Sequence, residues 1–235
     1  MMYLIGFAAS YLLVKYQVKR EKIPVKFEHI ESLYSWMVLG LLLGARLGYV
    51  LFYDLAAYLR NPLEILAVWH GGMSFHGGLM GAVTAGLIFS ARNRLDFWLL
   101  SDMVIVTTPI GIGLGRLGNF INAELYGRVT GVPWGMVFPG GGPLPRHPSQ
   151  LYEFLLEGVL LFIILWFILR PRSLRTGALT AMFLILYGLF RFFVEFFREP
   201  DAQIGFLFGV FTMGQLLSFG MIMAGAGILI HRRKV

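Results

Sequence analysis

Eight ionisable side chains lie within strongly apolar stretches of this sequence, where a charge is costly and usually serves a function. They are Arg46, His76, Asp102, Arg116, Glu153, Glu157, Arg191 and Glu195. Arginine offers a planar fork of N–H donors that suits a phosphate group, and histidine or carboxylate side chains can hold a proton. Together these residue types predict a site for an anionic, phosphate-bearing ligand.

A polar stripe runs along one otherwise apolar segment. Tyr187, Arg191, Glu195 and Arg198 follow the spacing i, i+4, i+8 and i+11, which places them on one face of a helix. A self-satisfying Arg191–Glu195 pair is the simpler interpretation, but it explains less well why Arg198 continues the stripe. We therefore expect this face to belong to a site.

Residues 70–81, HGGMSFHGGLMG, contain more glycine than helix propensity would justify. We expect a bent start to a membrane span, with backbone approaching a ligand and His76 at the bend. A structural histidine that caps the helix is the alternative. His70 and His76 are six residues apart, a poor spacing for one helical face, so no metal is expected.

The densest cluster of glycine and polar residues is 111–131, GIGLGRLGNFINAELYGRVTG. A glycine-rich turn that presents backbone N–H groups beside Arg116 would bind an anion. Asn119, Asn122 and Glu124 add hydrogen-bonding groups that a plain membrane span would avoid. A dinucleotide-binding fingerprint is excluded because no soluble βαβ pattern surrounds the glycines.

The elements that must position these residues are membrane helices. Of the 235 residues, 57% are hydrophobic and only 14% are charged, and the mean hydropathy is +0.70. Soluble domains carry about 25% charged residues, so the expected solvent is lipid. The absence of cysteine excludes disulfides, thiolate metal sites and a cysteine nucleophile. Seven apolar stretches are predicted spans, at roughly 1–14, 33–53, 71–91, 97–118, 151–169, 177–197 and 205–230.

The first stretch would rise only about 21 Å as a helix, which is too short to cross a bilayer. We expect the chain to begin inside this span; a signal peptide, the alternative, would want its basic residues before the apolar run. Thirteen of the twenty Lys and Arg follow the first, third, fifth and seventh stretches. This predicts an outer N-terminus and a cytoplasmic C-terminus. The net charge of +7 is then an insertion signal, and no nucleic-acid binding is expected.

The largest predicted outer segment is 120–149, which is rich in glycine and proline. We interpret it as a small head segment between the fourth and fifth spans, and we expect Ser149 to be the N-cap of the helix that follows. The predicted fold is an all-α integral membrane protein of seven transmembrane helices, the first one short, in a single domain over 1–235.

Five motifs stand in order along the chain: GARLGYVLFY (44–53), GGMSFHGGLMG (71–81), GRLGNFINAELYGR (115–128), RHPSQLYE (146–153) and YGLFRFFVEFFREPDAQ (187–203). On these motifs the chain resembles the prolipoprotein diacylglyceryl transferase family over nearly its whole length. The resemblance implies an enzyme of the bacterial inner membrane that uses no cofactor. It would move the diacylglyceryl group of phosphatidylglycerol to the thiol of the lipobox cysteine in a preprolipoprotein signal peptide, the first step of lipoprotein maturation.

The resemblance also assigns roles to individual positions. Arg116 and Arg191 are expected to bind the phosphate, and His76 is the candidate general base, although an arginine could instead lower the thiol pKa directly. The expected substrate-binding residues are Asn119, Glu124, Gly127, Tyr187, Glu195, Arg198 and Asp102. The expected partners are phosphatidylglycerol and the signal peptide, and we expect a monomer.

Two other functions compete with this one. A transporter or binder of an anionic lipid without chemistry would need polar groups on both sides of the membrane. Apart from Asp102, the polar residues within spans gather toward the predicted outer face, which favours a one-sided site. A different phospholipid-using transferase is the second competitor, and a required divalent metal would favour it.

Overall fold

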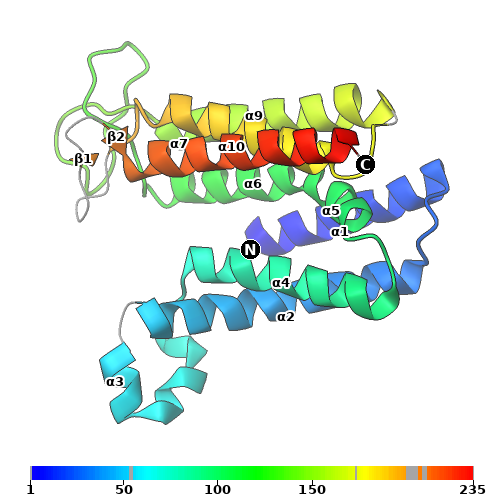
Figure 1. Cartoon of the computed structure of the whole chain (residues 1–235). Coiled ribbons are helices and arrows are strands. Elements are labelled where there is room, and N and C mark those ends of the chain that lie inside the picture. The colour runs from blue at the N-terminus through cyan, green and yellow to red at the C-terminus, as the bar shows by residue number, and fades with distance from the viewer. Residues whose placement is uncertain (1, 53–54, 173, 200–205, 208–210, 235) are drawn as a thin grey trace. The chain divides into compact units, whose positions relative to one another are not determined.

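The computed structural model describes residues 2–52, 55–172, 174–199, 206–207 and 211–234 (Figure 1). Their regular structure is helical apart from two short strands, β1 (Phe206–Leu207) and β2 (Phe211–Thr212), which pair antiparallel. The chain divides into two compact units, each described by itself below. The first unit is Met1–Val14 with Ser101–Val235, and the second unit is Lys15–Leu100.

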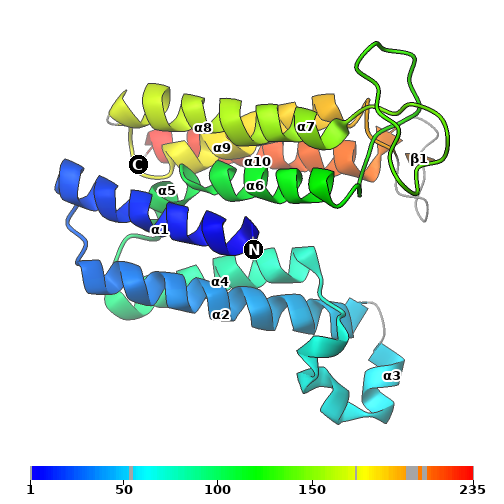
Figure 2. The same cartoon turned by 180° about the vertical axis from the view of Figure 1, so that it is seen from behind.

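The second unit is built on two helices that run side by side, α2 (Phe27–Phe52) and α4 (Phe75–Asn93) (Figures 1 and 2). Glycines four residues apart line their contact: Gly40, Gly44 and Gly48 on α2, and Gly77 and Gly81 on α4. A Cβ added at Gly44 would lie 2.7 Å from the Cα of Gly81, so a larger residue would force the helices apart. Small residues at this spacing let membrane helices approach closely. These glycines therefore allow close contact with a neighbouring helix. From the sequence we expected the glycines of 70–81 to allow the backbone to approach a ligand.

The link between these helices contains α3 (Leu55–Arg60), η1 (Pro62–Leu66) and η2 (Val68–His70). Arg46, buried on α2, holds this link in place. Its guanidinium donates to five backbone oxygens, those of Glu64, Ile65, Ala67, Gly71 and Gly72. The donors of Arg46 are thus committed to the fold. The expected bend before α4 is confirmed, since Gly71 and Gly72 have φ values of +85° and +75°, but His76 lies within α4 and not at the bend.

The first unit contains the remaining long helices. They are the N-terminal part of α1 (Met2–Glu21), the end of α5 (Phe97–Ile105), α6 (Thr108–Ile121), α9 (Ala178–Val194) and α10 (Met213–Lys234). A further helix over 149–172 is made of α7 (Ser149–Glu153), η3 (Phe154–Leu160), α8 (Leu161–Ile163), η4 (Ile164–Leu169) and η5 (Arg170–Arg172), with η3 and η4 in π-helical geometry. Figure 2 shows α6 beside the helix over 149–172.

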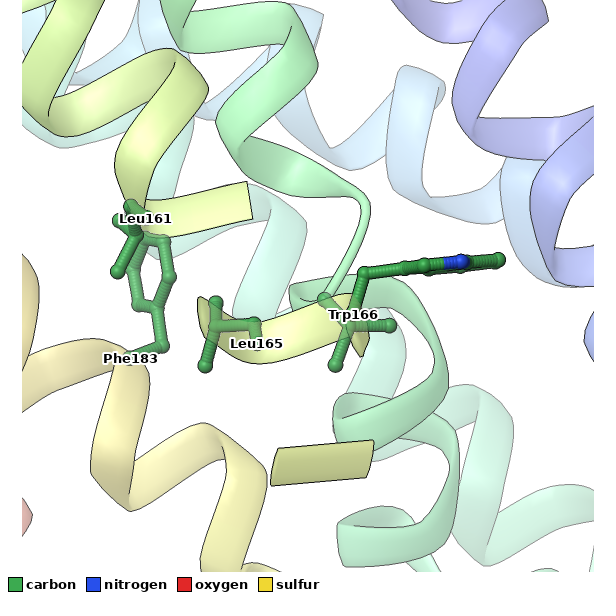
Figure 3. Packing of buried hydrophobic residues seen from close by; sticks show 5 residues of the cluster. Leu161, Leu165, Trp166 and Phe183 are labelled. Atoms are coloured by element: carbon green, nitrogen blue, oxygen red, sulfur yellow. The ribbon is translucent and has the colours of Figure 1, made fainter. Parts of the chain in front are cut away.

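Apolar side chains join these helices into a core. The buried cluster consists of Val106, Leu161, Leu165, Trp166 and Phe183. Figure 3 shows Leu161 and Leu165 beside Phe183 of α9, while Trp166 is directed away from them. The core fixes α9 against the helix over 149–172, and both helices carry residues of the predicted site.

Between α6 and α7 the chain forms an irregular segment over 122–148. Isolated antiparallel bridges pair Val129 and Met136 with Arg146. Arg146 also donates to the backbone oxygens of Gly127 and Gly141 and pairs with Glu199, its Nη1 lying 2.8 Å from Oε2. Because its donors hold the segment together, Arg146 is not available to bind a phosphate.

Among the described residues, three helical segments are long and apolar enough to cross a membrane: Phe27–Phe52, Ser149–Arg172 and Met213–Arg232. The expected span over 97–118 consists of α5 and α6, bent by 41° where they meet, and would be a fourth. The apolar α9 has 17 residues. Helix α1 continues past the predicted end of the first span at residue 14 and ends at Glu21. An integral membrane protein rich in helices is thus confirmed, and the count of seven spans stays a prediction.

Candidate active site

Glu153 is the centre of a buried ion cluster in the first unit. Its side chain is 1% exposed, and its carboxylate contacts three arginines from different parts of the chain. Nε of Arg116 lies 3.1 Å from Oε2, and Nη1 of Arg198 lies 3.5 Å from Oε1. Nη1 of Arg191 donates a hydrogen bond to Oε1. The cluster thus joins α6, α7, α9 and the turn after α9.

Two more carboxylates complete the cluster through Arg191. Nη2 of this arginine lies 3.1 Å from Oε2 of Glu195, and Nη1 lies 3.8 Å from Oε1 of Glu157. The simple Arg191–Glu195 pair is therefore present, but it is one part of a larger set. With three arginines and three glutamates ionised, the cluster is neutral by itself.

The polar stripe on α9 leads into this cluster, as its spacing predicted. Arg191 lies in the last turn of α9, Glu195 is the C-cap, and Arg198 follows in the next turn. Tyr187 stacks on Phe183 of the core with ring centroids 5.6 Å apart. Arg191, Glu195 and Arg198 thus form ion pairs in the cluster, and Tyr187 joins the site to the core.

The carboxylate of Glu195 has room because residue 214 is glycine. A Cβ added at Gly214 would lie 2.6 Å from the carboxyl carbon of Glu195. Gly214 is in the first turn of α10, whose N-terminal end carries a partial positive charge. The start of α10 therefore stabilises this carboxylate together with Arg191.

The turn after α6 carries the predicted amide and carboxylate group. Oε1 of Glu124 accepts hydrogen bonds from Nδ2 of Asn119 at 2.9 Å and Nδ2 of Asn122 at 3.3 Å. Ala123 and Leu125 have φ values of +54° and +58°, a conformation that costs non-glycine residues free energy. Backbone strain of this kind gathers at functional sites.

The same turn is fastened to the helix that bears Glu153. Nε2 of Gln150 donates to the backbone oxygen of Glu124 at 2.7 Å, and Oγ of Ser149 donates to that of Leu125 at 3.1 Å. Ser149 is the first residue of α7 and Pro148 is its N-cap, so the prediction that Ser149 is the cap was wrong. Its hydroxyl is used instead to fix the turn next to the cluster.

Gly127 is required by close packing of three backbone segments. Its N–H donates to the oxygen of His147 at 2.9 Å, and it forms a bridge with Arg198. A Cβ at this position would lie 2.8 Å from Cβ of His147. Gly127 thus keeps Arg198 in place, and no direct contact with a ligand is needed to explain it.

His147 contributes an oriented polar contact beside the same packing. Burial lowers the pKa of His147 and so favours the neutral form of its ring. Its Nδ1 lies 3.1 Å from the hydroxyl of Tyr152, which accepts a hydrogen bond from Nε1 of Trp134 at 2.8 Å. Tyr152 is therefore free to donate its own proton to His147, and the three side chains form a chain of hydrogen bonds.

The glycines before Arg116 do not form the expected anion-binding turn. Residues 111–121 are part of α6, so their N–H groups serve the helix. A Cβ added at Gly113 would lie 3.2 Å from the Cα of Gly158, so this glycine allows α6 to pack closely on the neighbouring helix. An anion must then be bound by side chains, and Arg116 is the available one.

Arg116 is the least committed arginine of the cluster. Its ion pair with Glu153 uses Nε, and no residue in the described part of the chain accepts a hydrogen bond from its guanidinium. Its side chain is 19% exposed. The terminal N–H groups of Arg116 can therefore bind a phosphate without breaking the cluster.

His76 belongs to the second unit, where it is the second residue of α4 and exposed. The N-cap of α4 is Ser74, whose hydroxyl accepts from the N–H of Gly77 at 3.2 Å. The alternative that His76 caps this helix was therefore wrong. Its ring makes an edge contact with Phe75, and within the described ranges no hydrogen bond to it is formed.

Asp102 has a structural role at the opposite end of α9. Its carboxylate accepts hydrogen bonds from the N–H groups of Gly177 and Thr180, each at 2.7 Å, and from the Thr180 hydroxyl at 2.6 Å. Thr180 and Arg191 are separated by about 16 Å along the helix. The structure does not bring Asp102 to the ion cluster.

Glu153 and Glu157 are the residues whose importance the sequence did not reveal. Both are ionisable groups within a predicted span, but the sequence alone indicates no role for either. Their i, i+4 spacing on one helix was the available signal, since it places both carboxylates on one face. In the described residues, no three His, Cys, Asp or Glu side chains are grouped as metal ligands would be.

Fold and site together define an integral membrane protein with a buried arginine–glutamate cluster. The sequence model of the prolipoprotein diacylglyceryl transferase family matches residues 1–231. A phosphatidylglycerol–prolipoprotein diacylglyceryl transferase of Desulfotalea psychrophila is 53% identical over 243 residues, which cover 100% of this chain and 89% of that protein. Proteins of the same name from Geobacter sulfurreducens and Pseudomonas paraeruginosa are 52% and 51% identical, covering 100% and 98% of this chain and 91% and 86% of their own lengths. The chain belongs to the prolipoprotein diacylglyceryl transferase family.

Proposed function

We propose that this protein transfers the diacylglyceryl group of phosphatidylglycerol to the thiol of the lipobox cysteine of preprolipoproteins. The observation that carries the proposal is Arg116, an arginine at the edge of the ion cluster whose terminal N–H groups form no hydrogen bond with a described residue. A phosphodiester headgroup suits such a donor set. The names of the curated relatives support the same substrate pair.

The reaction forms a C–S bond at C3 of the lipid glycerol and breaks the C–O bond to the phosphate, which leaves as glycerol phosphate. Arg116 and Arg191 stabilise the negative charge that grows on the leaving phosphate. His76 removes the thiol proton; the thiol has a reference pKa of about 8.5 and is mostly protonated at pH 7. Asn119 and Glu124 orient the headgroup hydroxyls, while Gly127, Glu195 and Arg198 hold the site together. Tyr187 anchors it to the core, and Asp102 acts through the start of α9.

Incubation of the purified protein with phosphatidylglycerol and a lipobox peptide tests this function. We expect the peptide to gain the mass of one diacylglyceryl group, and a peptide with serine in place of its cysteine to gain none. Release of glycerol phosphate should match the modified peptide in amount. An unmodified peptide, with lipid moved across vesicle bilayers instead, would contradict the proposal and favour a transporter.

For the arrangement in the membrane, we propose a monomer with seven spans in the bacterial inner membrane. The segment over 120–149 forms an outer head, the N-terminus is outside and the C-terminus is cytoplasmic. The alternation of basic loops supports this orientation. It puts the ion cluster near the outer leaflet, on the side from which a signal peptide presents its cysteine.

The orientation can be tested by cysteine labelling, because the chain has no cysteine of its own. Single cysteines replace Gly141 and Lys234, and intact cells are treated with an impermeant thiol reagent. We expect labelling at position 141, with position 234 labelled only after the cells are opened. Labelling of position 234 alone in intact cells would show that the orientation is reversed.

A further inference from the structure

Glu157 is the least compensated charge of the ion cluster. Its side chain is fully buried, and no described residue donates a hydrogen bond to either carboxylate oxygen. Its ion pair is with Nη1 of Arg191 at 3.8 Å, and that same nitrogen donates to Glu153. A buried carboxylate without hydrogen bonds is poorly stabilised as an anion.

Charged and titratable groups surround Glu157 on the elements packed against it. Arg191 and Tyr187 face it from α9, Arg116 from α6, Glu153 from one turn earlier on its own helix, and Arg198 from beyond α9. Glu195 joins the set through Arg191. Because three arginines face three glutamates, the cluster has no positive charge to spare for a ligand when all six groups are ionised.

A bound phosphodiester adds one negative charge to this balanced set. An uncompensated charge in such an environment is costly, so the site must lose a negative charge or gain a positive one. Arg191 is shared by all three glutamates, and any turn of its guanidinium toward the phosphate weakens its contact with Glu157. Protonation of Glu157 would make the cluster with its bound phosphodiester neutral again. Of the three glutamates, Glu157 has the weakest contacts that stabilise an ionised carboxylate.

We propose that Glu157 takes up a proton when the phosphodiester headgroup binds, and that it thereby acts as a positioning residue for Arg191. The inference rests on the proposed function, since it presupposes an anionic phospholipid in the cluster. One proton comes from the solvent and one O–H bond forms on Glu157; no bond of the lipid changes in this step. The neutral carboxyl group then no longer competes with the phosphate for Arg191, which keeps its contacts with Glu153 and Glu195.

Calorimetry measures this proton directly. A short-chain phosphatidylglycerol, kept below its micellar concentration, is titrated into the detergent-solubilised protein in two phosphate-free buffers that differ in ionisation enthalpy. We expect uptake of about one proton per lipid bound, with affinity that falls about tenfold per pH unit as pH rises through the neutral range. The sign follows because a complex that holds one more proton is favoured at low pH.

Variants of Glu157 separate this role from a structural one. Glu157→Gln should bind the lipid without proton uptake and with an affinity that does not change with pH, whereas Glu157→Asp should keep the pH dependence. Glu28→Gln, at an exposed carboxylate of α2, is the matched control and should behave as the wild type. A residue that only supports the fold would lower affinity equally at every pH.

The wild-type measurement decides the matter even if Glu157→Gln fails to fold. Lipid binding without proton uptake would overturn the role of Glu157 and leave the proposed function intact. Uptake that persists in a folded Glu157→Gln variant would also overturn it. A protein that neither binds phosphatidylglycerol nor modifies the lipobox peptide would overturn both proposals.

Discussion

Arg116→Ala should lower kcat/KM for diacylglyceryl transfer by about 10²–10³-fold, the usual loss when one positioned donor to a developing negative charge is removed. The protein should remain folded, because Glu153 keeps its contacts with Arg191 and Arg198. Arg116→Lys should recover little of the rate, since lysine keeps the charge but lacks the planar fork. Transfer rates and elution of the detergent-solubilised protein as a single species are the measurements.

Two comparisons make this expectation specific. Arg60→Ala removes an exposed arginine at the end of α3 and should leave the rate unchanged. Arg191→Ala should abolish transfer and also destabilise the protein, because Arg191 contacts three carboxylates where Arg116 contacts one. Near-normal turnover in Arg116→Ala would remove Arg116 from the phosphate site.

The contrast between the two arginines shows where sequence patterns were sufficient. The helical spacing of Arg191, Glu195 and Arg198 predicted that these residues lie together, and they do meet in the ion cluster, although α9 ends at Val194. Spacing along one helix is a local property that an apolar background makes visible. The membrane character was also predictable, because it follows from the high hydrophobic and low charged content of the chain.

The glycines show where patterns were not sufficient. The sequence alone does not distinguish a glycine that permits a left-handed turn from one that permits a close helix contact or the approach of a ligand. At Gly71 and Gly72 the reason is backbone conformation, while Gly77 and Gly113 allow close packing on another helix. Only the partner across the contact distinguishes these cases, and a single sequence does not contain it.

The centre of the ion cluster was hidden for a related reason. Glu153 is separated by dozens of residues from both Arg116 and Arg191, so their meeting depends on how three helices pack. Asp102 illustrates the converse, because the family resemblance suggested a substrate contact while its carboxylate caps α9. An ionisable residue within a span indicates that the side chain has a role, and only its contacts show whether that role is structural or in the site.

His76→Gln should reduce the rate at neutral pH by about 10²–10⁴-fold if His76 is the general base. His76 is suited to the role because its exposed ring has no hydrogen-bond partner among the residues that the structure describes. Raising the pH from 7 to 9 should recover part of the loss, since the ionised fraction of a thiol with the reference pKa rises by about 25-fold. The measurement is the pH dependence of kcat/KM for wild type and variant.

The matched control is His70→Gln, which removes the nearby histidine that pairs with Glu64, with Nδ1 and Oε2 2.9 Å apart. It should leave both the rate and the pH dependence unchanged. If His76 instead supports the fold, His76→Gln should lower the thermal stability and gain nothing at high pH. If an arginine lowers the thiol pKa directly, the variant should remain stable, with a small loss of rate and the wild-type pH profile. That last outcome would contradict the role of His76 as a base and would leave the thiolate to form beside the arginine cluster.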